Sequence, residues 1–279
     1  GTGPYQLKLW EPDVRIVLDR FEGYWGRKPE FPRLIVVPVK SPQTAIEKLR
    51  RGEVHVVDHL TLADAKALEN DPVAALESGP SLSVCYLGFN LKKAPYNNPD
   101  FRKAVSLALD RGTLNTVAYH GLAEPATNLI PPAIWRNLCP TPPYELDLER
   151  AKAHLAKVPL ESRKVELIHM TFARPYIPEP QRVAEWVKDQ LRKIGIEVTL
   201  SGYDKAAYTQ KYKEAGHPMF LLGWFADIAD PDNFFHPLLH GDSKDDMNGS
   251  FFDDPAFNSA VSEARRELDP ARRKALYAV

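Results

Sequence analysis

The sequence predicts an α/β protein with mixed sheets flanked by helices, and two observations predict it. Short runs rich in β-branched and aromatic residues alternate with segments whose apolar residues recur at helical spacing. Many helical segments open with a capping Ser, Thr, Asn or Asp, often followed by Pro. The 25 prolines favour short elements joined by rigid loops, and the 279 residues suffice for roughly two domains.

The first third of the chain is expected to be rich in strands. The sequence at residues 11–13 predicts a turn between the first two strands, and Gly52 is expected to close the helix that Ser41 caps. Thr61 is expected to cap the next helix. The elements expected here are strands 5–9, 14–18, 34–39, 54–57 and 83–91, and helices from residue 42 and over 62–68.

After about residue 89 the pattern becomes more helical, with helices opened by capping residues. Residues 121–144 hold six prolines and little periodicity, which indicates a long loop. The elements expected here are helices from 98, from 113, over 147–157, 178–194 and 204–215, and from 254 and 269, with strands 164–169, 196–200 and 219–222.

The most informative segment follows the last of these strands. Gly223 is expected to let another group approach the backbone closely, and Trp224 offers a flat apolar surface. Asp227 brings a charge that needs a cationic partner wherever it is buried. Such a strand end could hold an amine-bearing ligand; the alternative is a buried Trp followed by a helix start, with Asp230 as cap and Pro231 at the first position.

Composition excludes several function classes. The formal net charge is −1, and no run approaches the roughly 20 apolar residues that span a bilayer. The first residues show no basic segment followed by an apolar one, so we expect no signal peptide among them. Nucleophile motifs and phosphate-binding glycine loops are absent, so we expect no enzyme, no cofactor and no nucleic-acid partner. Basic residues near the end, at 265–266 and 272–274, are expected to form solvated helix faces.

Two further groups leave alternatives open. His236 and His240 have the spacing that places two imidazoles on one helix face, as a zinc site requires. Pro237 lies between them and no general-base Glu accompanies them, so they are weak metal candidates and a polar helix end is the favoured interpretation. Cys85 and Cys139 could form one disulfide bond, but the sequence does not decide it.

Several motifs resemble, in order, those of one family. The chain is similar to the extracytoplasmic solute-binding proteins of ABC importers, in the oligopeptide, dipeptide and nickel group known as family 5. The motifs that carry the resemblance are Gly1–Tyr5, Arg51–Val54, Gly88–Asn90, Pro95–Arg111, Ile130–Pro132, Leu191–Val198, Gly223–Asp227 and Asp230–Phe234.

The resemblance implies a type II periplasmic-binding-protein architecture, in which two lobes close on a ligand. It implies that the chain is an internal fragment, with residues 1–83 as part of the first lobe and 84–279 as most of the second. The hinge is expected near residues 84–91. A monomer is expected, in a parent protein that is periplasmic or a cell-surface lipoprotein.

The resemblance also implies a peptide-binding site. Asp227 would pair with the ligand amino group, Trp224 would lie beside the cleft, and Phe225 and Asn90 would lie nearby. Some relatives carry an Arg before this Trp for the ligand carboxylate, but here apolar residues 220–222 stand there. The expected partners are a small peptide and ABC permease subunits; the alternatives are a metal or metallophore binder and a sensing domain of a transcriptional regulator.

Overall fold

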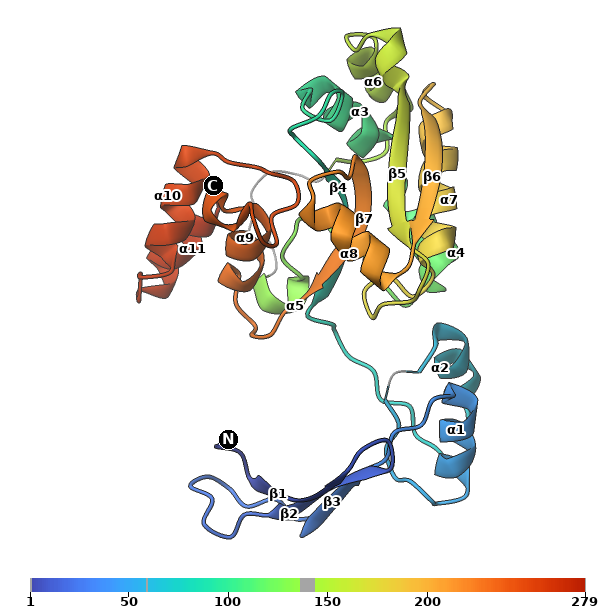
Figure 1. Cartoon of the computed structure of the whole chain (residues 1–279), viewed down its shortest axis with the longest axis vertical. Coiled ribbons are helices and arrows are strands. Elements are labelled where there is room, and N and C mark those ends of the chain that lie inside the picture. Colours follow the sequence, from blue (N-terminus) through green and yellow to red (C-terminus); the bar gives the residue numbers. More distant parts are fainter. Residues whose placement is uncertain (1, 59, 136–143, 279) are drawn as a thin grey trace. The chain divides into compact units, whose positions relative to one another are not determined.

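A computed structural model describes residues 2–58, 60–135 and 144–278 (Figure 1). The chain forms two compact units, Gly1–Glu77 and Ser78–Val279. The expected lobe boundary lies close by, between residues 83 and 84. Among the described residues, no helix is long and apolar enough to cross a membrane.

The first unit holds a three-stranded antiparallel sheet and two helices. In the order β1-β2-β3, Leu7, Leu18 and Leu34 lie in register, and the 11–13 turn joins β1 to β2 as predicted. Ser41 and Thr61 cap the two helices with their side chains, and Gly52 adopts a positive φ of 71° after the first. The elements are β1 (Tyr5–Glu11), β2 (Arg15–Arg20), β3 (Arg33–Val36), α1 (Pro42–Arg50) and α2 (Leu62–Leu68).

The second unit is built on a mixed four-stranded sheet. Its order is β4-β7-β5-β6, with β4 antiparallel to β7 and the other neighbours parallel. Because β6 is the edge strand next to β5, the connection from β5 to β6 leads toward that edge of the sheet. The connection from β6 to β7 leads in the opposite direction, across β5. Right-handed crossovers therefore place α7 and α8 on opposite faces of the sheet (Figure 1). The strands are β4 (Ser83–Phe89), β5 (Lys164–Met170), β6 (Glu197–Tyr203) and β7 (Met219–Phe225).

Helices cover both faces of this sheet, and a further group of helices lies at one side of it. The inward face predicted for α7 is confirmed, since Val183, Trp186, Val187 and Leu191 are all buried. Figure 1 shows α9, α10 and α11 together, beside the end of β7. The helices are α3 (Pro99–Ala108), α4 (Arg111–Tyr119), α5 (Pro132–Trp135), α6 (Leu148–Leu155), α7 (Pro180–Arg192), α8 (Lys205–Lys213), α9 (Asp232–Leu239), α10 (Pro255–Ala264) and α11 (Pro270–Tyr277), with 3₁₀ turns η1 (Leu160–Arg163) and η2 (Gly241–Ser243).

Two apolar clusters stabilise the second unit. The larger lies between the sheet and α3, α4, α6, α7 and α8. The smaller joins α9, α10 and α11 to Val84 of β4 and Ala226 just after β7. The smaller cluster therefore supports the segment that leaves β7.

Three expectations need correction or restatement. The strand predicted at 54–57 is wrong: these residues are irregular, and Val56 is 84% exposed, because no described strand pairs with them. The helix after Pro231 begins at Asp232, with Pro231 at the N-cap. The hinge near 84–91 stays a prediction; residues 83–89 pair with β7 along their whole length.

Candidate functional site

The end of β7 and the first residue after it are packed closely against neighbouring groups. A Cβ on Gly223 would lie 2.2 Å from Cδ2 of Tyr176 and 2.5 Å from the carbonyl oxygen of Val84. The close approach predicted at Gly223 is thus made by the ring of Tyr176. Beyond the strand, the N–H of Ala226 donates to the carbonyl of Leu82 at 3.0 Å, which extends the pairing.

Asn233 joins the two residues that the sequence singled out. Its Oδ1 accepts a hydrogen bond from the indole Nε1–H of Trp224 at 3.2 Å and from the backbone N–H of Asp227 at 3.0 Å. The indole is half-buried against the smaller cluster. Asn233 belongs to the motif Asp230–Phe234 named above, but no local sequence pattern indicated this role.

Asp230 is bound by an arginine from α11. Arg273 donates to both carboxylate oxygens, at 2.6 and 2.8 Å, and the two side chains are only 24% and 25% exposed. Burial disfavours the charged carboxylate, but the guanidinium and the N–H of Asp232 outweigh it and lower the pKa of Asp230. The same hydrogen bonds raise the pKa of Arg273.

Asp232 has a weaker partner at the C-cap of α10. Nε of Arg265 lies 3.3 Å from its Oδ2, with the arginine side chain 47% exposed. The expectation that the basic residues at 265–266 and 272–274 form solvated faces is therefore wrong for Arg273, whereas Arg265 is exposed as expected, although both arginines have carboxylate partners. Their partners lie more than 30 positions away in the sequence, so helical periodicity could not indicate them.

Asp227 differs from these two carboxylates. Its side chain is exposed, and no hydrogen bond or ion pair to its carboxylate exists within residues 2–58, 60–135 and 144–278. Next to it, Phe225 is 55% exposed and Ile228 is 60% exposed. The segment thus presents one unneutralised carboxylate among apolar side chains, with its backbone fixed by Asn233.

Asn90 lies in a different environment. It is fully buried, and its Nδ2 donates to the carbonyls of Ala215 and His217 at 3.1 and 2.8 Å. Its Oδ1 accepts from the N–H of Lys92 at 3.0 Å. These contacts give the amide a structural role after β4, and its predicted contact with a ligand stays a prediction.

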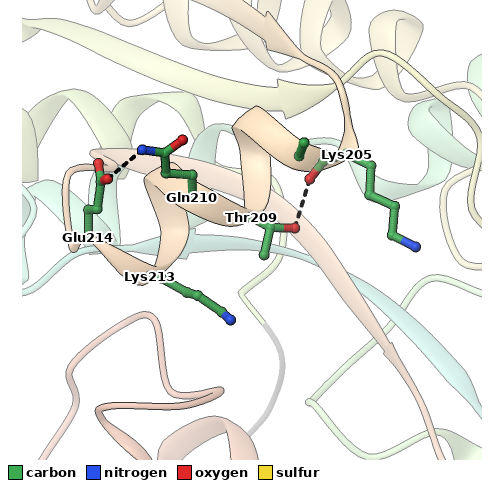
Figure 2. Close-up of a pocket in the computed structure, with 6 residues that line it drawn as sticks. Lys205, Thr209, Gln210, Lys213 and Glu214 are labelled. Carbon is green, nitrogen blue, oxygen red and sulfur yellow. Dashed lines mark hydrogen bonds between the residues drawn. The ribbon is translucent and has the colours of Figure 1, made fainter.

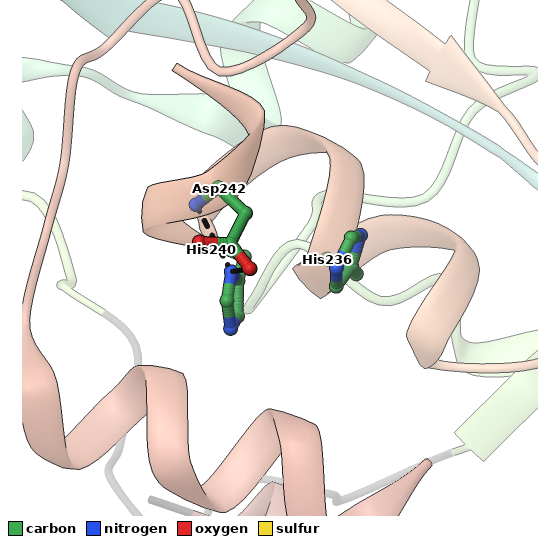
Figure 3. A group of neighbouring side chains, drawn as sticks. All are labelled: His236, His240 and Asp242. Carbon is green, nitrogen blue, oxygen red and sulfur yellow. Dashed lines mark hydrogen bonds and ion pairs between the residues drawn. The ribbon is translucent and has the colours of Figure 1, made fainter.

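His236, His240 and Asp242 lie together, with potential ligand atoms within 4.8 Å of one another (Figure 3). The two rings are stacked, with 4.7 Å between their centroids and 22° between their planes, so their lone pairs lie in nearly parallel planes, unlike the converging ligands of a tetrahedral zinc site. Nδ1 of His240 accepts from the N–H of Asp242, and Nε2 contacts Ser262 at 3.1 Å. This arrangement fits a helix end better than a metal site.

Burial and the positive charge of Arg265 lower the pKa of His236. Burial also raises the pKa of Cys85 to about 11, which makes its thiol a weak nucleophile. Cys139, its possible disulfide partner, lies outside the described residues.

A surface hollow of about 670 Å³ follows one face of α8 (Figure 2). All the residues that line it come from that helix and its end, and three of its polar side chains bond within the helix: Thr209 donates to the carbonyl of Lys205, and Gln210 donates to Glu214 at 2.7 Å. None of the predicted site residues borders it. Its lining residues are Lys205, Ala206, Thr209, Gln210, Lys213 and Glu214.

Comparison with known proteins gives consistent results. Residues 1–246 match the family described as bacterial extracellular solute-binding proteins, family 5 Middle. The chain is 32% identical over 279 residues to the dipeptide-binding protein of Escherichia coli (strain K12), covering 99% of this chain and 52% of that protein. It is 30% identical over 278 residues to heme-binding protein A of Haemophilus influenzae, covering 99% of this chain and 51% of that protein.

Solved structures agree with these relatives. An ABC transporter-associated periplasmic binding protein from Helicobacter pylori, in complex with the peptide STSA, superimposes with a TM-score of 0.80 at 31% identity. The alignment covers 100% of this chain and 54% of that one. The type II periplasmic-binding-protein fold is therefore confirmed, and the chain spans about half the length of the curated relatives that it matches.

Proposed function

The chain belongs to the family 5 bacterial extracellular solute-binding proteins, and on this premise we propose that it binds peptides for an ABC importer. In this proposal the carboxylate of Asp227 pairs with the ligand α-amino group. The full-length protein acts outside the cytoplasm, closes two lobes over the peptide and passes it to membrane permease subunits.

The single observation that carries the proposal is the difference among three neighbouring carboxylates. Asp230 and Asp232 have arginine partners, whereas Asp227 has none among the described residues. An ammonium group that reaches Asp227 would form a charge-assisted hydrogen bond, which strengthens as ligand and protein exclude water. Every free peptide carries such an ammonium, so this contact is independent of side-chain identity.

The flanking aromatic residues suit the same ligand. Trp224 and Phe225 offer apolar surface on either side of the strand end, and the indole is oriented by Asn233. The preceding residues 220–222 lie in β7, and Phe220 and Leu221 are buried. This stretch supplies no cation for the ligand carboxylate, so we propose recognition through the amino end.

Replacing Asp227 tests the proposal. In the full-length protein, Asp227→Asn should weaken binding of dialanine and of STSA by about 1.5–3 kcal/mol, the range for a hydrogen bond to a charged group. Isothermal titration calorimetry measures this. Asp245→Asn serves as the matched control, because it removes the same charge from an exposed residue outside the segment. Equal affinities for the two variants would rule out the role of Asp227.

A further inference from the structure

We propose that Arg273 of α11 is a positioning residue for peptide binding, because it fixes the segment that carries Trp224 and Asp227. The inference rests on the proposed function of that segment. It concerns a helix beyond the family match, which ends at residue 246.

The guanidinium of Arg273 is held on three sides. Besides the two bonds to Asp230, its Nε donates to the carbonyl of Ala264 at 2.9 Å and its Nη2 to the hydroxyl of Tyr277 at 3.2 Å. A planar guanidinium that donates to both oxygens of one carboxylate fixes direction as well as distance. Arg273 therefore determines both the position and the orientation of Asp230.

The residue that supports Arg273 from behind is buried and packed between rings. Tyr277 is 2% exposed, and its ring packs against Phe235 of α9 at 5.7 Å and against Trp135 of α5 at 6.3 Å. Burial raises the pKa of Tyr277 to about 12, so its hydroxyl stays protonated at neutral pH. The arginine is thus anchored in the smaller apolar cluster, and its guanidinium faces the segment.

Hydrogen bonds connect Asp230 to the ligand-facing residues. Its Oδ1 accepts from the N–H of Asp232 at 2.9 Å, and its carbonyl accepts from the N–H of Asn233 at 3.1 Å. Asn233 in turn binds the indole of Trp224 and the backbone of Asp227. Arg273 is therefore linked through Asp230 and Asn233 to both residues.

The pair also has an electrostatic effect. Asp230 lies three positions from Asp227, and without Arg273 its carboxylate would be a second anion for the ligand ammonium. With the pair intact, Asp227 is the remaining unneutralised carboxylate of the three in the described segment. The pair thus favours one position for the ligand amino group.

The first measurement is binding by the full-length protein. If loss of the pair reduces the population of the binding-competent segment to about one third to one tenth, the affinity falls about 3- to 10-fold. We expect this loss for Arg273→Gln with dialanine and STSA. Arg272→Gln is the matched control, because Arg272 is an exposed arginine on the same helix, and it should keep affinity within about 2-fold.

The second measurement distinguishes positioning from general destabilisation. In ligand-free protein labelled with ¹⁵N-tryptophan, the Nε1–H resonance of Trp224 should shift or broaden in Arg273→Gln and stay unchanged in Arg272→Gln. The resonance of Trp186, buried in the larger cluster, is the internal reference. Asp230→Asn, which removes the charge and keeps the shape, should reproduce the Trp224 change if Arg273→Gln does not fold.

The outcomes separate the two proposals. An unchanged Trp224 resonance in folded Arg273→Gln or Asp230→Asn overturns the positioning role. A changed resonance with affinity as in Arg272→Gln also overturns it. If the wild-type protein binds neither peptide, the proposed function fails, while the resonance still shows whether Arg273 fixes the segment.

Discussion

Gly223 lies under the ring of Tyr176, so even one added methyl group has no room there. A Cβ at this position would also meet the carbonyl oxygen of Val84, which belongs to the backbone and moves with difficulty. Because overpacking typically costs about 1–3 kcal/mol, Gly223→Ala should lower the free energy of unfolding by that amount. Urea denaturation measures the change.

Gly79→Ala is the control for this prediction, since a Cβ there meets nothing within 4 Å. A loss equal to that of the control would mean that the ring of Tyr176 moves aside freely. The close approach could be predicted from an isolated Gly at a strand end, but the approaching residue could not, because Tyr176 lies 47 positions earlier in the chain.

Among elements, the turn after η2 depends on a buried histidine that precedes β7. The side chain of His217 is fully buried, its Nε2 lies 2.7 Å from the carbonyl of Gly249, and its ring stacks on Tyr212 at 4.9 Å. Burial lowers the pKa of His217, although its contacts with backbone carbonyls oppose this. His217 therefore joins the start of β7 to residues 248–251 in its neutral form.

The pH dependence follows from this lowered pKa. As pH falls below about 6.5, the unfolded chain binds a proton before the folded chain does. The stability contribution of neutral His217 is thus full above about pH 6.5 and is lost as pH falls through the folded-state pKa. Urea denaturation at pH 7.5 and pH 5 should show a smaller pH-dependent loss in His217→Gln than in wild type.

His55→Gln is the control, because His55 is exposed in the first unit. It should keep the wild-type pH dependence. Identical slopes for wild type and His217→Gln would show that the buried ring does not titrate differently in the folded and unfolded states.

The helices and strands could be predicted where they depend on residues close by in the sequence. Ser41, Thr61, Asn98 and Asp254 each cap the helix that the sequence assigned to them, because a cap depends on residues two or three positions away. The failures depend on distant partners. Residues 54–57 have strand-forming side chains but no described neighbour to pair with, and Arg273 matches a solvated helix face until its carboxylate partner is known.

The candidate site shows the same division. Trp224 and Asp227 could be identified from the motif that follows a buried strand, and the family resemblance supplied their expected roles. The hydrogen bonds of Asn233 and the ion pair of Arg273 arise from tertiary packing. The sequence thus suffices to propose Trp224 and Asp227 as ligand contacts, and the structure was needed to find the residues that hold them.

At the scale of the whole molecule, the chain supplies one side of the proposed recognition. It spans about half the length of its curated relatives, so we expect the full-length protein to supply the remaining contacts of the cleft. Ligand capture by closing lobes would exclude water from Asp227 and strengthen its bond to an ammonium. The proposed function thus depends on recognition of the ligand amino group.

The most direct test changes the ligand and leaves the protein intact. Calorimetric titration of the full-length protein compares dialanine with N-acetyl-dialanine, which lacks the ammonium, and repeats both with Asp227→Asn. We predict that acetylation weakens binding to the wild type by at least about 10-fold, the equivalent of about 1.4 kcal/mol, and has a much smaller effect on the variant. Equal affinity of the wild-type protein for both ligands would contradict recognition of the amino group by Asp227.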